Sequence, residues 1–215
     1  TAAVDAQTAW RAIGFGARAG ILERAAQLFD ERSDELALVA TLEEGKTLPE
    51  ARGEAVLSAE TCRFQAGLAK TSTERIFPSG TPGETIRTVR APLGVIGVIT
   101  PWNFPILIPV WKIAPALICG NALVFKPASA TPLSAVKLIE IFEEAGLPAG
   151  VLNLVTGPGG QVGNALVESP DVKGISFTGS TSMGKHVNEV VSSRFGKTIL
   201  ELGGNNCIIV DETAD

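Results

Sequence analysis

Apolar residues in the amino-terminal part of the chain, residues 2–70, follow a helical pattern. Within residues 17–32, the apolar positions at helical spacing are Ile21, Leu22, Ala25, Leu28 and Phe29. Ser33 is a candidate N-cap of a second helix that ends at Gly45, and Pro49 fits the first turn of a third helix. We expect packing helices here and assign them no chemistry.

A stretch rich in proline and glycine follows, from Thr71 to Glu84. This composition predicts a loop. Residues 85–90 then alternate apolar side chains with Arg87 and Arg90, which predicts a half-exposed strand. We expect this strand to be an edge available for pairing with another subunit.

From Leu93 onward, short apolar runs alternate with helix-forming stretches. The expected strands are residues 93–99, 122–125, 151–155, 174–178 and 198–202. Thr131 is expected to cap the helix that Pro132 opens and Gly146 ends. Strands that alternate with helices form a parallel sheet with right-handed crossovers, so the chain is predicted to be an α/β protein with a doubly wound parallel sheet.

The sequence LGVIGVITPWNFP, residues 93–105, holds the first candidate for chemistry. Its apolar run contains Gly94 and Gly97, which predicts a buried strand that other backbone approaches closely. Asn103 follows in a turn framed by prolines, at the strand end where α/β proteins bind ligands. Its amide offers two uncharged N–H donors, which suit an oxygen that becomes negative during a reaction. An Asn that only caps the next helix is the alternative.

Three later turns follow strands in the same way. Lys126 leaves its strand at the carboxyl end, where a cation can reach ribose hydroxyls or a phosphate, although an ordinary surface Lys is the alternative. GPGGQVG, residues 157–163, brings glycines to a helix start but does not match GxGxxG, so its nucleotide signal is weak. In FTGS, Gly179 and Ser180 precede a helix whose free N–H groups favour an anion such as a pyrophosphate, or Ser180 is only an N-cap.

The motif ELGG places the carboxylate of Glu201 at the end of an apolar strand, beside glycines that leave room. A carboxylate in that place is a candidate general base. A structural Glu in a salt bridge is the alternative.

Composition narrows the function classes. The chain has 215 residues, is 45% hydrophobic, and carries a net charge of −5 without a basic block, which argues against nucleic-acid binding. Its three cysteines, Cys62, Cys119 and Cys207, lie far apart without a CxxC pair. This spacing argues against a disulfide scaffold and a metal site, and it favours a reducing, cytoplasmic location.

The 21 residues between Arg90 and Lys112 are uncharged, which is long enough for a membrane span. Several prolines interrupt them, and no aromatic belt or basic flank frames them. We therefore expect a buried strand followed by a core helix. No membrane partner is expected.

TPWNFP, FKPAS, FTGS and ELGG, in this order and spacing, resemble the aldehyde dehydrogenase superfamily, and the likeness extends back to TLEEGKT at residues 41–47. The resemblance implies a Rossmann-like fold with a short protruding β-hairpin. It also implies oxidation of an aldehyde to an acid with NADP or NAD as cofactor: a cysteine thiolate attacks the aldehyde, hydride passes to the nicotinamide, and water hydrolyses the thioester. Its members suggest a homodimer or homotetramer.

Carried over motif by motif, the resemblance implies that Asn103 is the oxyanion donor and Glu201 the general base for water. The cofactor-binding residues that it implies are Ile99, Thr100, Pro101, Trp102, Lys126, Ala128, Ser129, Gly159, Gly163, Phe177, Thr178, Gly179, Ser180, Gly184 and Leu202. NAD-preferring members often carry Glu at the position of Ser129. Its absence here predicts that NADP is accepted at least as well as NAD.

The resemblance also implies what this chain lacks. The family's nucleophilic cysteine lies a few dozen residues beyond ELGG, and the chain ends at Asp215, while Cys207 fits a buried strand residue. We therefore expect residues 1–84 and 94–202 to form a cofactor-binding domain, residues 85–93 an oligomerisation hairpin strand, and residues 203–215 the start of a catalytic domain cut short.

Two function classes remain open: part of an enzyme, or a nucleotide-binding module or inactive scaffold. Asn103 and Glu201 favour an active parent, since a scaffold needs neither. A reductase that acts on an acyl phosphate or acyl-CoA is disfavoured, because a water-activating base suits hydrolysis. Residues 108–117 and 125–160 are most similar to dehydrogenases of 2-oxoglutarate semialdehyde, with succinate semialdehyde dehydrogenases next. This similarity suggests a semialdehyde of a dicarboxylic or keto acid as substrate.

Overall fold

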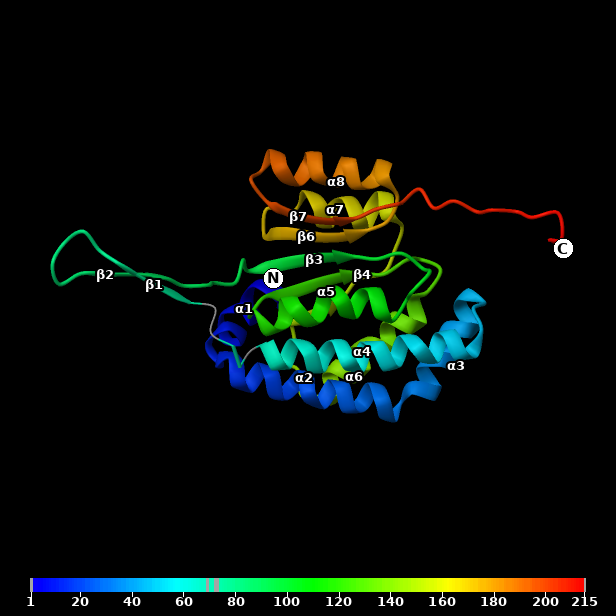
Figure 1. The fold of residues 1–215 in the computed structure, drawn as a ribbon, viewed down its shortest axis with the longest axis horizontal. Helices are drawn as coiled ribbons and strands as arrows, with labels where there is room; N and C mark the ends of the chain where they lie inside the picture. The colour runs from blue at the N-terminus through cyan, green and yellow to red at the C-terminus, as the bar shows by residue number, and fades with distance from the viewer. Residues whose placement is uncertain (1, 69, 72–73, 215) are drawn as a thin grey trace.

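A computed structural model of the chain describes residues 2–68, 70–71 and 74–214. In sequence, a layer of helices comes first, then a two-stranded hairpin, then an α/β sheet. The hairpin projects away from the rest of the structure (Figure 1). The helices are α1 (Ala2–Ala12), α2 (Gly14–Glu31), α3 (Ser33–Glu44), α4 (Leu48–Leu68), α5 (Leu107–Ile118), α6 (Pro132–Glu144), the π-helix η1 (Gly159–Gly163), α7 (Asn164–Glu168) and α8 (Thr181–Ser193). The strands are β1 (Arg75–Pro78), β2 (Thr85–Thr88), β3 (Val95–Ile99), β4 (Ala122–Lys126), β5 (Leu152–Leu154), β6 (Val172–Thr178) and β7 (Lys197–Glu201).

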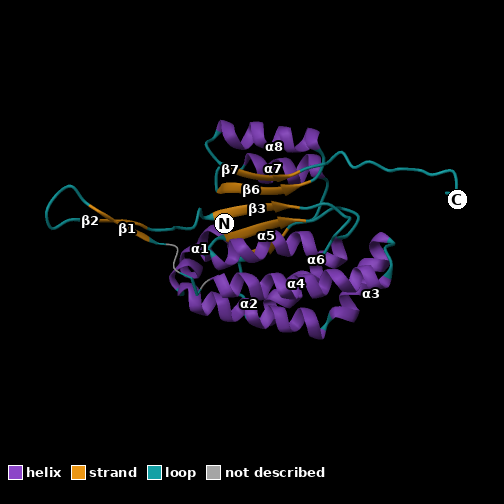
Figure 2. Cartoon of the chain, in the orientation of Figure 1, coloured by secondary structure: helices purple, strands orange, loops and turns teal. Residues whose placement is uncertain are grey.

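The main sheet has five strands in the order β5-β4-β3-β6-β7, and all of its pairings are parallel. The chain starts in the middle at β3, moves outward to β5, returns past β3 to β6 and ends at β7 (Figure 2). This reversal beside β3 is the switch point at which doubly wound folds bind ligands. The predicted α/β class and the Rossmann-like sheet are confirmed.

Two apolar cores lie on the two faces of the sheet. Alternate residues of β3 separate, so that Ile96 and Val98 join the core made with α2 to α6, while Val95 joins the core made with α7 and α8. Gly97 is needed between them, because a Cβ there would lie 2.4 Å from Cδ1 of Ile175. The close approach predicted at Gly97 is therefore made by side chains and not by backbone.

The protruding hairpin is confirmed, but the loop predicted for residues 71–84 is wrong in part. Arg75–Pro78 is strand β1, and it pairs antiparallel with β2. β2 finds its partner within the chain, and both strands are exposed on both faces rather than half-exposed. Proline and glycine content indicated the turn correctly, but it concealed the strand before the turn.

Two predicted helix caps take another form. Ser33 is the first residue of α3 and not its N-cap, whereas Gly45 ends α3 in a left-handed conformation, as expected. Thr131 occupies the N-cap position of α6, but its side chain accepts no capping bond. The carboxylate of Glu43 on α3 accepts instead from the backbone N–H groups of Leu133 and Ser134, at 2.7 Å each. A negative group at a helix N-terminus is stabilising. The N-terminus of α6 is therefore capped by a side chain from α3 and not by the residue that precedes it.

The residues after β7 contradict one expectation. Cys207 was predicted to lie buried in a strand, but it is exposed, and residues 202–210 form no strand. Within the described residues this segment pairs with no neighbouring strand, so its apolar side chains stay in solvent: Ile208 is 88% exposed and Ile209 is 91% exposed. The segment leads away from the sheet as an extended chain (Figure 1).

Candidate functional site

The parallel register brings the predicted site residues to one edge of the sheet. Ile99 pairs with Lys126 on one side and with Phe177 on the other, and Thr178 pairs with Glu201. The segments that follow these strands therefore leave from neighbouring points. Those segments carry Thr100, Pro101, Trp102, Asn103, Ala128, Ser129, Gly179, Ser180 and Leu202.

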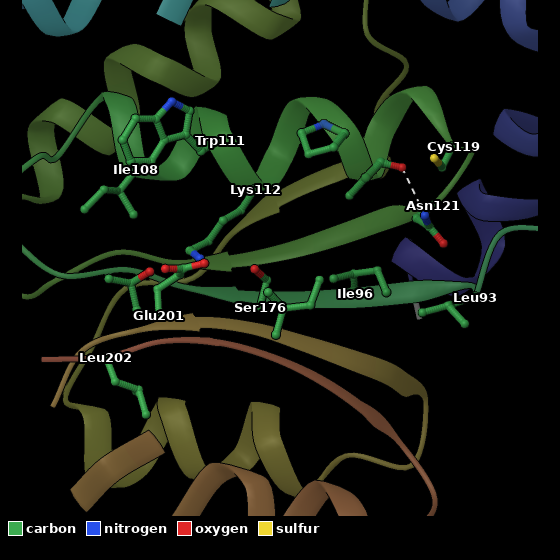
Figure 3. Close-up of a pocket in the computed structure, with 14 residues that line it drawn as sticks. Leu93, Ile96, Ile108, Trp111, Lys112, Cys119, Asn121, Ser176, Glu201 and Leu202 are labelled. Carbon is green, nitrogen blue, oxygen red and sulfur yellow. Dashed lines mark hydrogen bonds between the residues drawn. The ribbon is translucent and has the colours of Figure 1, made fainter. Parts of the chain in front are cut away.

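A cavity of about 580 Å³ lies beside Glu201, between β3, β6 and β7 on one side and α5 on the other (Figure 3). Lys112 extends from α5 toward the Glu201 carboxylate, and Trp111 lies on the same helix. Lys112 is buried, and this burial lowers the pKa of its ammonium, while the charge of Glu201 acts in the opposite direction. Glu201 is thus an exposed carboxylate with a cation facing it across the cavity.

The turn after β4 meets the turn after β5 at a second cavity, of about 350 Å³, lined by residues that include Ala128 and Ser129. The Ser129 hydroxyl donates to the carbonyl oxygen of Gly157 at 3.2 Å, which joins the two turns. Lys126 is buried, and its ammonium donates to the carbonyl oxygen of Pro127 at 2.6 Å. Burial lowers the pKa of Lys126. An ammonium has three donors, so two remain for another acceptor.

The amino terminus of α8 lies at the same edge. Ser180 is the N-cap of α8, and its hydroxyl accepts a hydrogen bond from the backbone N–H of Met183 at 3.3 Å. Its side chain therefore caps the helix, which was the alternative to anion binding. The Leu202 side chain packs against Gly184, where a Cβ would lie 2.3 Å from the Leu202 Cδ2. Phe177 is buried in the core under α7 and α8, so its side chain does not open onto the edge.

Other predicted residues take different positions. Thr100 is buried, and its hydroxyl has no hydrogen-bond partner among the described residues. Trp102 and Asn103 are exposed. Gly159 and Gly163 lie in η1, which runs into α7, so these glycines stand at a helix start as expected. Gly163 lies against the Lys126 side chain: a Cβ there would be 3.8 Å from its Cδ.

The helical part contributes residues that the sequence interpretation missed. Lys46 donates to the Asn103 carbonyl oxygen at 2.7 Å, and Glu54 accepts from the backbone of Ile106. In the sequence, Lys46 stands out only as part of TLEEGKT, a motif that carries the family likeness. Charged residues in a motif between apolar helices are the signal that could have indicated this role.

None of the three cysteines forms a disulfide. Cys62 is buried, and burial raises the pKa of its thiol to about 12. Cys119 follows the end of α5 and is exposed as a residue, but the protein around its thiol removes part of the solvent. This partial burial also raises the pKa of the thiol. Among the described residues no group of His, Cys, Asp or Glu is arranged to hold a metal ion, and no described helix has the length and apolar content to cross a membrane.

Comparison with known proteins identifies the family. The aldehyde dehydrogenase family matches the chain over residues 1–215. The chain belongs to this family. Alpha-ketoglutaric semialdehyde dehydrogenase of Bacillus subtilis is 47% identical over 215 residues, which are 100% of the chain and 44% of that protein. 2,5-Dioxopentanoate dehydrogenase of Saccharolobus solfataricus is 46% identical over 92% of the chain and 42% of its own length.

Solved structures share the fold of the chain. An NADP-dependent enzyme of E. coli superposes with a TM-score of 0.92 and 43% identity, over 95% of this chain and 42% of that one. Betaine aldehyde dehydrogenase of Staphylococcus aureus, solved with NAD+, superposes with a TM-score of 0.91 and 36% identity, over 94% and 41%. The chain therefore spans less than half the length of the aldehyde dehydrogenases that it matches.

Proposed function

We propose that this chain forms the cofactor-binding part of a longer aldehyde dehydrogenase, which oxidises an aldehyde to a carboxylic acid with NADP+ or NAD+. The observation that carries the proposal is the shared sheet edge: Thr100, Lys126, Gly179 and Glu201 meet there through the parallel register. The edge is also the switch point of the fold, where a dinucleotide binds in doubly wound proteins.

The residues at this edge fit a dinucleotide. The buried Thr100 hydroxyl has no partner in the part of the chain that the structure describes, and Lys126 has two N–H donors left for a hydroxyl or a phosphate. The 13-residue helix α8 begins at the edge, and the partial positive charge of its N-terminus favours a pyrophosphate. Ser129 and Ala128 line the neighbouring cavity, which suits the adenosine end. The bound cofactor would accept the hydride of the aldehyde.

The chemistry at the aldehyde divides between Asn103 and Glu201. When the thiolate of a cysteine outside this chain adds to the aldehyde, the carbonyl oxygen becomes negative, and the Asn103 amide donates a hydrogen bond to it. After hydride departure leaves a thioester, the Glu201 carboxylate takes a proton from water, which then attacks the thioester carbon. The Lys112 ammonium extends toward the Glu201 carboxylate from the facing helix (Figure 3).

The domain limits follow from the same proposal. Residues 1–84 and 94–202 hold the cofactor, although the hairpin that interrupts them already begins at Arg75. β1 and β2 project from the body with exposed Ile76 and Ile86, so this hairpin is the proposed contact with a second copy in a homodimer or homotetramer. Residues 203–215 would begin the catalytic domain.

Two relatives named for a five-carbon keto-acid semialdehyde support a substrate of that class. A nucleotide-binding module without turnover is the second candidate, since the shared edge by itself accounts for cofactor binding and not for the chemistry at the aldehyde. An acyl-CoA or acyl-phosphate reductase would not need Glu201 as a base for water.

Cofactor choice depends on Ser129, and we expect NADP+ to bind at least as tightly as NAD+. Ser129→Glu should shift the ratio of their affinities toward NAD+ by at least about tenfold, or about 1.4 kcal/mol. Its carboxylate would stand near the 2′-phosphate, and two like charges about 4 Å apart repel by roughly 1 kcal/mol in water and about 4 kcal/mol at an effective dielectric of 20. Equilibrium titration of the longer enzyme with each cofactor measures the ratio.

Ser129→Ala is the matched control, since it removes the bond to Gly157 without adding charge. It should change the affinity ratio much less than Ser129→Glu. Added salt should weaken NADP+ binding more than NAD+ binding, because it screens the extra phosphate. A much tighter binding of NAD+ by the unmutated enzyme, or an unchanged ratio in Ser129→Glu, would contradict the assignment.

A further inference from the structure

A lysine from the helical layer holds the loop that carries Asn103. Lys46 lies between α3 and α4, and its ammonium donates to the main-chain carbonyl oxygen of Asn103 at 2.7 Å. The same ammonium lies 4.2 Å from the centre of the Phe104 ring, a cation–π contact. Lys46 therefore contacts two consecutive residues, and the first is the proposed oxyanion donor.

The partner of Lys46 holds the other end of the loop. Glu54, on α4, pairs with Lys46 through Oε1, and its Oε2 accepts from the backbone N–H groups of Ile106 and Leu107 at 3.1 Å each. The N-cap residue of α5 makes no side-chain capping bond of its own. One carboxylate therefore neutralises the lysine and caps α5, so a single ion pair fixes residues 103–107 at both ends.

This ion pair is buried. The Lys46 side chain is 9% exposed and that of Glu54 is 1% exposed, and a second carboxylate, Glu44, lies 3.3 Å from the same ammonium. Burial raises the pKa of Glu44, and Lys46 opposes that shift. Buried ion pairs seldom stabilise a fold more than apolar residues of similar size would. A role for this one beyond stability is therefore worth testing.

We propose that Lys46 and Glu54 are positioning residues for the oxyanion donor. They fix the main chain on both sides of Asn103, so that its amide is already in place when the aldehyde oxygen becomes negative. A donor displaced by about 1 Å can cost about 100-fold in rate. The inference rests on the proposed function of Asn103, and Lys46 and Glu54 act only through it.

A half-buried cation of the same helical layer, Arg32, provides a control. Arg32 pairs with Glu35 on α3 and with Glu140 and Glu144 at α6, and it contacts no predicted site residue. Arg32→Met removes a cation from a carboxylate cluster in the same helical layer, as Lys46→Met does. Both variants should lose stability, but only Lys46→Met should affect the chemistry at Asn103.

The test uses single-turnover hydride transfer by the longer enzyme at saturating NADP+, followed as NADPH absorbance. Lys46→Met should slow the transfer at least about tenfold, with KM for NADP+ changed less than about twofold, because the loss acts on the oxyanion alone. Lys46→Arg keeps the charge and the donors and should recover most of the rate. Arg32→Met should leave the transfer rate unchanged.

Double substitution separates positioning from a general structural effect. In an Asn103→Ala background, Lys46→Met should slow hydride transfer less than about twofold, because residues that act through one group are not additive. The same loss in both backgrounds would overturn the inference, as would an unchanged rate in Lys46→Met alone. If Lys46→Met does not fold, Glu54→Ala replaces it in the same cycle with the same expectations, since it removes the acceptor of the Ile106 and Leu107 N–H groups together with the partner of Lys46.

Hydrogen exchange gives a readout that does not depend on activity. In Lys46→Met, the peptide that contains residues 103–107 should exchange its amide hydrogens faster than in Arg32→Met, and equal exchange would count against the inference. If Asn103→Ala alone leaves hydride transfer unchanged, the oxyanion role fails and this inference fails with it. If Asn103→Ala is slow and Lys46→Met is not, only the inference fails.

Discussion

Asn103→Ala should slow hydride transfer in the longer enzyme by about 100- to 1,000-fold, which corresponds to about 2.7–4 kcal/mol of lost oxyanion stabilisation. The amide donates to an oxygen that carries charge only after the thiolate adds, so its loss acts on the transition state more than on the bound aldehyde. Stopped-flow measurement of NADPH formation in a single turnover isolates this step. KM for NADP+ should change little.

Asn103→Asp sharpens this prediction, because it keeps the size of the side chain but removes both N–H donors. It should lose at least as much rate as Asn103→Ala. The backbone bond from Lys46 uses the Asn103 carbonyl oxygen, so neither variant removes that contact directly. A single-turnover rate within a few-fold of the unmutated enzyme would show that Asn103 serves only the local structure.

Glu201→Gln should affect the opposite half of the reaction. Without a carboxylate to take a proton from water, steady-state turnover should fall by roughly 100- to 10,000-fold, the usual range for a general base. Hydride transfer precedes this step, so the first turnover should remain fast and release a burst of about one NADPH per active site. Stopped-flow absorbance shows the burst and the slow phase in one trace.

Glu168→Gln, an exposed carboxylate at the end of α7, is a control that should show neither effect. Unchanged steady-state turnover of Glu201→Gln at neutral pH would mean that Glu201 is not the base. Loss of the burst together with the turnover would place Glu201 before hydride transfer instead of after it.

The sheet and the edge at which its strands end together were predictable because local patterns determine them. Residues 95–99 are a short run rich in Val and Ile that ends before two prolines, and its length, composition and flanking prolines together favour a buried strand followed by a turn. Strand–helix alternation then requires parallel pairing, and parallel pairing brings Lys126 and Glu201 to one edge.

The supports of the site were not predictable, because they join segments far apart in the sequence. Glu43 caps α6 about 90 residues away, and Glu54 caps α5 more than 50 residues away. A cap from the preceding residue has a local signature, as Ser180 illustrates, but a cap from another helix has none. Thr131 was assigned the role that Glu43 fulfils, since only the local candidate is visible in the sequence.

The error at Cys207 has a related cause. Its apolar run, residues 207–210, has the composition of a buried strand, but composition does not supply a partner strand. In the described part of the chain no strand pairs with this run, and it remains exposed. An apolar run of this kind therefore indicates that a strand can form, but the strand forms only where another segment pairs with it.

Aldehyde-dependent reduction of NADP+, followed at 340 nm with 2-oxoglutarate semialdehyde, tests the central claim most directly. It should be run on the 215-residue chain and on the longer enzyme side by side. We predict steady NADPH formation by the longer enzyme and none by the chain alone, because Cys119, which shares the cavity with Glu201, lies at its opposite end (Figure 3). Robust turnover by the chain alone that is lost in Cys207→Ala, or no turnover by the longer enzyme with any semialdehyde or cofactor, would contradict the account.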